Sequence, residues 1–166
     1  VPTFVSDFGV AEITAHYTMF YAAILAGITP PVATAAVVAA GIAEANFWRT
    51  CGAAMKIAAP LFVLPVAFVY NPGLITMTPG GATLLLGGLV MLGAIAIIYG
   101  LNYPFRLSVG RLLLVRAALT VLGVFVMTHP MMAVKLGGVA VFITVFVAEK
   151  VMARGLQLPF ARGVEQ

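Results

Sequence analysis

Two adjacent prolines, Pro30 and Pro31, interrupt a long apolar stretch that otherwise favours a helix. Neither proline has an N–H group to donate, and each ring clashes with the carbonyl four residues earlier. The carbonyls of Ala26 and Gly27 therefore lose their usual helical partners, and Pro31 suits the first position of a new helix. The sequence predicts a helix that is broken at this point.

The composition places this break inside a membrane. The 166 residues are 63% hydrophobic and only 8% charged, too few charges to cover a water-soluble domain. Bare backbone polar groups in hydrocarbon cost several kcal/mol each, so a broken membrane helix is tolerated only inside protein or beside a cavity. The net charge of +4 comes from so few ionic groups that it is read as a topology signal, with no nucleic acid as partner.

Hydropathy divides the rest of the chain into an all-α, polytopic arrangement of about five spans. We expect the broken transmembrane helix at 11–45, a cytoplasmic interfacial segment at 46–56, and a cytoplasmic tail at 149–166. Residues 1–10 are the end of an element on the outer side, and the missing initiator methionine predicts a piece of a longer polypeptide. Further transmembrane spans are expected at 57–70, 82–100, 112–127 and 131–148, and for the first of them an entry that includes part of the preceding segment is left open.

Charge sets the predicted orientation. Basic residues gather between the first two spans (Arg49 and Lys56), between the third and fourth (Arg106 and Arg111), and in the tail. These segments are therefore expected in the cytoplasm. Lys135 and Arg116 fit this pattern less well and are expected to snorkel or to face protein.

The break itself is a candidate cation site. Its ligands would be the carbonyls of Ala26, Gly27 and Ile28 together with the hydroxyl of Thr29. The alternative is a purely structural kink, although a single proline usually suffices for that purpose.

Other chemistry finds little support in the sequence. His16 and His129 are not expected to face each other at one depth as haem ligands must. The single Cys51 excludes an internal disulfide and a multi-cysteine metal site. No nucleophile–base pair, paired carboxylate or phosphate-binding loop is present in the sequence. The chain is therefore expected to be no enzyme and to carry no cofactor.

Several motifs resemble the fused permease subunit of tripartite ATP-independent periplasmic (TRAP) transporters, and most closely its branch with TAXI-type receptors. The resemblance covers residues 1–75 well and the remainder loosely. Arg111-Leu112-Leu113-Leu114 is similar to the start of the family's C-terminal helices. The main motifs are His16-Tyr17-Thr18-Met19-Phe20-Tyr21, Ile28-Thr29-Pro30-Pro31-Val32-Ala33, Ala39-Ala40-Gly41-Ile42-Ala43 and Pro65-Val66-Ala67-Phe68-Val69-Tyr70-Asn71-Pro72.

This resemblance implies the C-terminal portion of an elevator-type symporter in a bacterial or archaeal inner membrane. Residues 1–10 would end a re-entrant hairpin. A small carboxylate would arrive from a periplasmic solute-binding protein, driven by sodium bound at Thr29, with protons as the alternative. The family often has Ser or Asp where this chain has Ala26-Gly27, which leaves the ion identity open. Pro30, Pro31 and Val32, at the start of the next helix, would face the anionic substrate.

Further partners implied are the remaining permease helices of the parent chain and membrane lipid. The rival hypothesis is a non-transporting membrane anchor of an enzyme complex, in which the broken helix serves only packing. A neighbouring gene for a periplasmic binding protein would favour transport, and one for a soluble oxidoreductase would favour the anchor.

Overall fold

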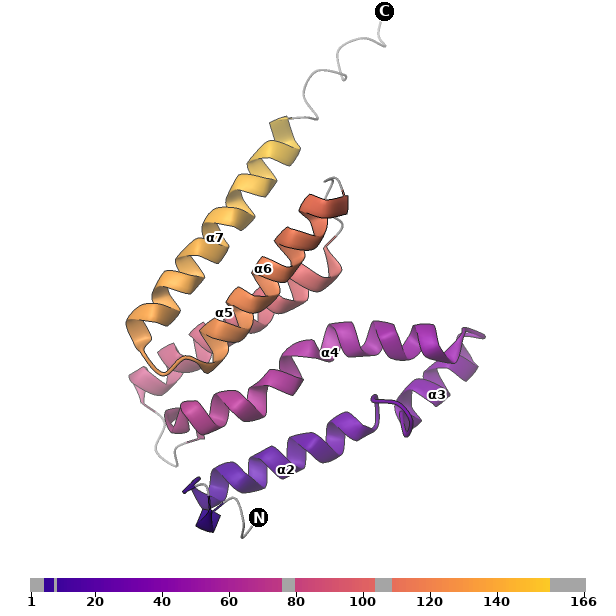
Figure 1. Ribbon diagram of the computed structural model, residues 1–166, viewed down its shortest axis with the longest axis horizontal. Coiled ribbons are helices and arrows are strands. Elements are labelled where there is room, and N and C mark those ends of the chain that lie inside the picture. The colour runs from indigo at the N-terminus through magenta and orange to yellow at the C-terminus, as the bar shows by residue number, and fades with distance from the viewer. Residues whose placement is uncertain (1–4, 8, 76–79, 104–108, 156–166) are drawn as a thin grey trace, which may run out of the picture.

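All regular structure in the described residues is helical (Figure 1). The computed structural model describes residues 5–7, 9–75, 80–103 and 109–155. The predicted all-α fold is confirmed for this part of the chain. In chain order its elements are α2 (Glu12–Ala26), α3 (Thr34–Ile42), α4 (Phe47–Tyr70), the 3-10 helix η1 (Pro72–Ile75), α5 (Gly81–Asn102), α6 (Val109–Thr128) and α7 (Met132–Gly155).

Four of these helices are long and apolar enough to cross a membrane: Phe47–Tyr70, Gly81–Asn102, Val109–Thr128 and Met132–Val151. The chain is a multi-pass membrane protein. The 15 residues of α2 rise only about 22 Å, less than the roughly 30 Å of a hydrocarbon core. The nine residues of α3 add about 13 Å. The two half-helices together therefore have the length of one further span.

The boundary expected between a polar segment at 46–56 and a span at 57–70 falls inside α4, which is one helix from Phe47 to Tyr70. Asn46 accounts for the early start, because its side chain accepts a hydrogen bond from the Arg49 N–H at 3.1 Å and caps the helix. The expected hairpin end and tail lie partly outside the described residues, which include neither 1–4 and 8 nor 156–166.

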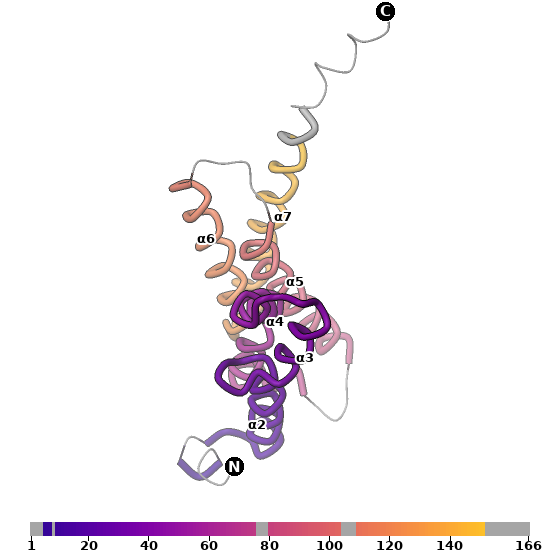
Figure 2. Tube along the Cα trace, turned by 90° about the vertical axis from the view of Figure 1, so that its right-hand side faces the viewer, coloured from indigo at the N-terminus to yellow at the C-terminus, as the bar shows by residue number. Residues whose placement is uncertain are grey.

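α4 separates the molecule into two parts (Figures 1 and 2). Among the described elements, α2 contacts only α4 and η1, and α3 contacts only α4. Tyr17 and Tyr21 of α2 pack on Phe68 near the end of α4, with ring centroids 5.8 and 5.7 Å apart. Ala36 of α3 packs with Cys51 near the start of α4. The broken pair therefore runs antiparallel along α4, while α5, α6 and α7 lie on the other side.

Two prolines inside α4 remove helical hydrogen bonds, and one of them is compensated by a neighbouring helix. Pro60 cannot donate to the carbonyl of Lys56. The side-chain amide of Asn102, the last residue of α5, donates to that carbonyl at 3.5 Å. This contact places the start of α4 and the end of α5 at the same end of the bundle.

α5 and α6 approach each other through glycines. A Cβ atom on Gly123 would lie 2.6 Å from the carbonyl oxygen of Gly93, and one on Gly100 would lie 3.0 Å from the Cβ of Leu119. Separations below 3.0 Å are not sustained between a real Cβ and a backbone atom. Small residues of this kind let helix backbones pack closely in membranes. The α5–α6 pair is therefore the closely packed centre of the bundle.

Candidate functional site

The predicted break is present between α2 and α3. α2 ends at Ala26 and α3 begins at Thr34, with seven residues of turns between them, Gly27–Ala33. The second helix thus starts three residues later than the position expected at Pro31. The first N–H groups of α3 accordingly belong to Thr34 and its successors.

The hydroxyl of Thr29 lies inside this break. Its Oγ1 donates to the carbonyl of Leu25 at 2.7 Å, and its N–H donates to the same carbonyl at 3.1 Å. A hydroxyl has one proton and two lone pairs. Because the proton is directed to Leu25, the lone pairs of Oγ1 are available to an electropositive ligand.

The carbonyls freed by the prolines are paired again across the break. Ala26 accepts from the N–H of Ala33 at 3.2 Å, and Gly27 accepts from the N–H of Ala35 at 2.9 Å. Each carbonyl keeps a second lone pair. The Ile28 carbonyl accepts no hydrogen bond from any residue that the structure describes. The break therefore offers one uncommitted carbonyl and two that have a single partner.

Ala33 holds the break in shape through an unusual backbone conformation. Its φ of 36° and ψ of 41° lie in the left-handed region, which costs a residue with a Cβ roughly 1–2 kcal/mol. Its N–H is shared between the carbonyls of Ala26 and Thr29, at 3.2 and 3.1 Å. The side chain is fully buried against Ala36 and Cys51. Packing and the shared hydrogen bond together hold Ala33 in this strained backbone conformation.

An open cavity of about 370 Å³ lies between α2 and the middle of α4. Two of the predicted cation ligands, Ala26 and Thr29, line it, whereas Gly27 and Ile28 do not belong to its lining. Of the predicted substrate-facing residues, Pro30, Pro31 and Val32, none belongs to it either, and Val32 is 58% exposed. The full lining is Thr18, Ala22, Leu25, Ala26, Thr29, Phe62 and Pro65.

The cavity lies at membrane depth. Phe62 is eight residues before the end of α4 at Tyr70, which corresponds to about 12 Å along the helix. Pro65 lies on the same wall and cannot donate to the carbonyl of Leu61, so the helix opposite the break is also short of one backbone hydrogen bond. The broken helix thus faces a continuous helix that lacks one backbone hydrogen bond across the cavity.

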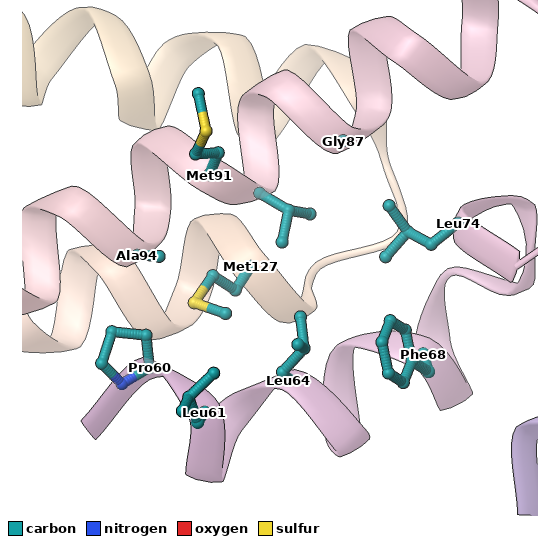
Figure 3. A pocket seen from close by; sticks show the side chains of 10 residues that line it. Pro60, Leu61, Leu64, Phe68, Leu74, Gly87, Met91, Ala94 and Met127 are labelled. Carbon is teal, nitrogen blue, oxygen red and sulfur yellow. The ribbon is translucent and has the colours of Figure 1, made fainter. Parts of the chain in front are cut away.

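A second cavity, of about 270 Å³, is lined by apolar residues alone (Figure 3). Pro60, Leu61, Leu64 and Phe68 of α4 face Met91 and Ala94 of α5 and Met127 of α6 in this view. Its lining contains no polar side chain. It therefore offers no side-chain ligand to an ion or to a carboxylate.

Sequence reasoning missed a polar cluster at the end of α6. Lys135 of α7 is fully buried, and its Nζ donates to the carbonyls of Val126 and Met127 at 3.0 and 3.2 Å. The side chain of Asn71, the C-cap of α4, donates to Met127 at 3.3 Å and to Ala67 at 3.0 Å. A cation at a helix C-terminus is favourable. Lys135 was expected either to snorkel or to face protein, and it faces protein. Its isolated position in an apolar span is the sequence signal that could have predicted a buried polar contact.

Titratable side chains outside that cluster form no metal centre. The described residues contain no group of three or more His, Cys, Asp or Glu that could hold a metal ion. His16 is paired only with Glu12, at 3.7 Å on the exposed face of α2.

These observations define a polytopic helical membrane protein with a discontinuous helix that borders a cavity at membrane depth. Residues 1–74 match the family described as Tripartite ATP-independent periplasmic transporter, DctM component. The predicted resemblance to TRAP permeases is confirmed over these residues. Neither the curated proteins nor the solved structures contain a match. The family is one of transporters, in agreement with the expectation that the chain is no enzyme. The TAXI-type branch stays a prediction.

Proposed function

We propose that this chain contributes to the permease of a symporter that imports a small carboxylate across a bacterial or archaeal inner membrane. The family supports transport with a periplasmic binding protein as partner. The observation that carries the proposal is the Thr29 hydroxyl, which lines a cavity at the break with its lone pairs uncommitted. Interrupted helices are the usual means by which transporters hold coupling ions and anionic substrates.

The coupling cation is bound by Thr29 Oγ1 and by carbonyls of the break. Ile28 supplies an uncommitted carbonyl, and Ala26 and Gly27 supply carbonyls with one hydrogen-bond partner each. No carboxylate takes part among these residues. Oxygen ligands without a titratable group suit sodium better than protons, since binding a proton requires a group that titrates.

The carboxylate substrate is held beside Pro30, Pro31 and Val32, at the start of α3. The N-terminus of a helix favours negative charge. Because α3 begins at Thr34, its first N–H groups lie just beyond these three residues. The remaining permease helices cover the apolar side chains that α2 and α3 expose, among them Phe20 at 59% and Val38 at 61%.

Replacing Thr29 with Val tests the ion site. The change removes one oxygen ligand and keeps the β-branched shape. One lost ligand costs about 1–3 kcal/mol, which is roughly a ten- to hundredfold loss of sodium affinity. The measurement is uptake against sodium concentration in proteoliposomes that contain the complete transporter.

Thr144→Val is the matched control. Thr144 also donates to the carbonyl four residues earlier, at 2.8 Å, but lies on the exposed face of α7. An unchanged sodium dependence in Thr29→Val would remove Thr29 from the site. Equal uptake driven by a proton gradient without sodium would replace sodium by protons as the coupling ion.

A further inference from the structure

Aromatic and basic side chains gather at the end of the bundle where α5 and α7 finish and α6 begins (Figure 1). Lys150 Nζ lies 3.3 Å from the hydroxyl of Tyr103 and 4.8 Å from the centroid of its ring. The same ammonium lies 5.6 Å from the ring of Phe146. Arg116 Nη2 donates to the backbone carbonyl of Tyr103 at 3.4 Å. Tyr103, Arg116, Phe146 and Lys150 are called the basic cluster below.

Within the described residues, no carboxylate forms an ion pair with the cations of the basic cluster. Glu149 is the neighbouring carboxylate, and it accepts a hydrogen bond from the hydroxyl of Tyr99 at 2.8 Å. Neither Arg116 nor Lys150 has a carboxylate within ion-pair distance in the described part of the chain. Arg116 Nε is buried without a hydrogen-bond partner. Two cations thus retain N–H groups for an anion.

The two helices that carry these cations also expose apolar side chains. Leu113 and Leu114 of α6 are 61% and 72% exposed, and Val147 and Val151 of α7 are 50% and 63% exposed. Figure 2 shows the first turns of α6 splayed away from α7 at this end. Because α6 and α7 are long and apolar enough to span a membrane, these side chains meet the acyl chains of the bilayer. A molecule with an anionic head and hydrocarbon chains would satisfy both the charge and the apolar surface.

We propose that the basic cluster binds the phosphate of an anionic phospholipid, whose acyl chains lie along the exposed apolar side chains of α6 and α7. The phosphate accepts hydrogen bonds from Arg116 and Lys150. On the orientation predicted from charge, this end faces the cytoplasm, where basic residues between helices meet anionic lipid. The site is separate from the broken helix, because α2 and α3 contact neither α6 nor α7.

Native mass spectrometry of the complete, detergent-purified protein tests the proposal. Phosphatidylglycerol and phosphatidylcholine with identical acyl chains are titrated separately, together with glycerol phosphate as a soluble anion. Both lipids carry the phosphate, but the quaternary ammonium of phosphatidylcholine is repelled by Arg116 and Lys150. We therefore expect retention of phosphatidylglycerol to be about tenfold tighter than that of phosphatidylcholine, a difference of about 1.4 kcal/mol. Equal retention of the two lipids would overturn the proposal without any mutation. Equal binding of glycerol phosphate would replace the lipid by a free phosphate.

Variants locate the site. Arg116→Gln with Lys150→Gln should abolish the preference for phosphatidylglycerol, while the charge-conserving pair Arg116→Lys and Lys150→Arg should retain most of it. The matched control is Arg49→Gln with Arg111→Gln, which removes two exposed charges outside the basic cluster. Equal losses in the control and in the first pair would show a diffuse surface effect and overturn the site. Arg116→Gln and Lys150→Gln are also measured singly, so that the result does not depend on the folding of the double variant.

Discussion

The helices on one side of α4 are interrupted, whereas those on the other side are continuous. On one side, α2 and α3 are separated by seven residues of turns, with a strained Ala33 and an Ile28 carbonyl that has no partner in the described structure. On the other side, α5 and α6 are continuous and touch through Gly93 and Gly123. Strain and unsatisfied polar groups cost stability, and they persist where function needs them. The comparison supports the proposal that the coupling ion binds on the first side, and the close packing of α5 on α6 gives the second side its rigidity.

Restoring a continuous helix at Pro30-Pro31 should have the largest effect, and this effect is on transport. Replacing Pro30 and Pro31 together with Ala removes both steric blocks and raises helix propensity by about 3 kcal/mol per position. α2 and α3 can then join, and the uncommitted Ile28 carbonyl gains a helical partner. We expect transport to be lost with membrane insertion retained, measured by uptake and by membrane yield. Full activity in this variant would reduce the break to a kink and end the functional contrast between the two sides.

A methyl group at the α5–α6 contact should have the next largest effect. Gly123→Ala places a Cβ 2.6 Å from both the Gly93 carbonyl and Ile97 Cγ1, and we expect a loss of about 3 kcal/mol. Gly137→Ala is the control, since a Cβ there meets nothing within 4 Å. Thermal unfolding in detergent should show a large drop for the first variant and none for the second. Equal behaviour of the two would mean that α5 and α6 are not tightly packed.

Lys135→Met tests the polar cluster at the end of α6. The carbonyl of Val126 loses its Lys135 donor, whereas Met127 keeps the Asn71 amide. An unsatisfied buried acceptor costs about 1–3 kcal/mol, and removal of a desolvated charge offsets part of that cost. We expect a net destabilisation of about 1 kcal/mol in thermal unfolding. A more stable Met variant would show that the lysine is retained for a reason other than stability.

The smallest effect on stability is expected at Ala33, where relief of backbone strain offsets the cost of introducing glycine. Glycine adopts the left-handed region without a Cβ penalty, but Ala33→Gly also removes a fully buried methyl group, which is worth about 0.8 kcal/mol. With the extra chain entropy counted, Ala33→Gly should change the free energy of unfolding by less than about 0.5 kcal/mol. Ala39→Gly, in the interior of α3, should destabilise it by about 1 kcal/mol. Thermal unfolding of the two variants gives the comparison. An equal loss of stability in the two variants would show that Ala33 is not strained.

Hydropathy and proline chemistry predicted much of this fold. They identified the break at Pro30-Pro31 and the helices α4 to α7, because both signals are local in sequence. The start of α4 was left open, because the residues that follow the Asn46 cap are polar and hide the beginning of the helix from a hydropathy scan.

The remainder depends on tertiary contacts. The left-handed conformation of Ala33 is enforced by partners such as Cys51, and no residue type marks it in advance. Likewise, the position of Phe62 and Pro65 opposite Thr29 follows from how α2 packs on α4. The predicted ligands therefore came from one segment only, and the second wall of the cavity was not foreseen.

Lys135 also bears on how the protein enters the membrane. Its two carbonyl acceptors, Val126 and Met127, precede it by only nine and eight residues. The α6–α7 hairpin can therefore solvate its own lysine as soon as both helices have formed, before α4 or α5 is in place. A charge at the centre of an isolated helix opposes its insertion by about 2.5–3.5 kcal/mol. Lys135 lies in the first turn of α7, where the cost is smaller, and the hairpin lowers that cost further. This favours entry of α6 and α7 into the bilayer as a pair.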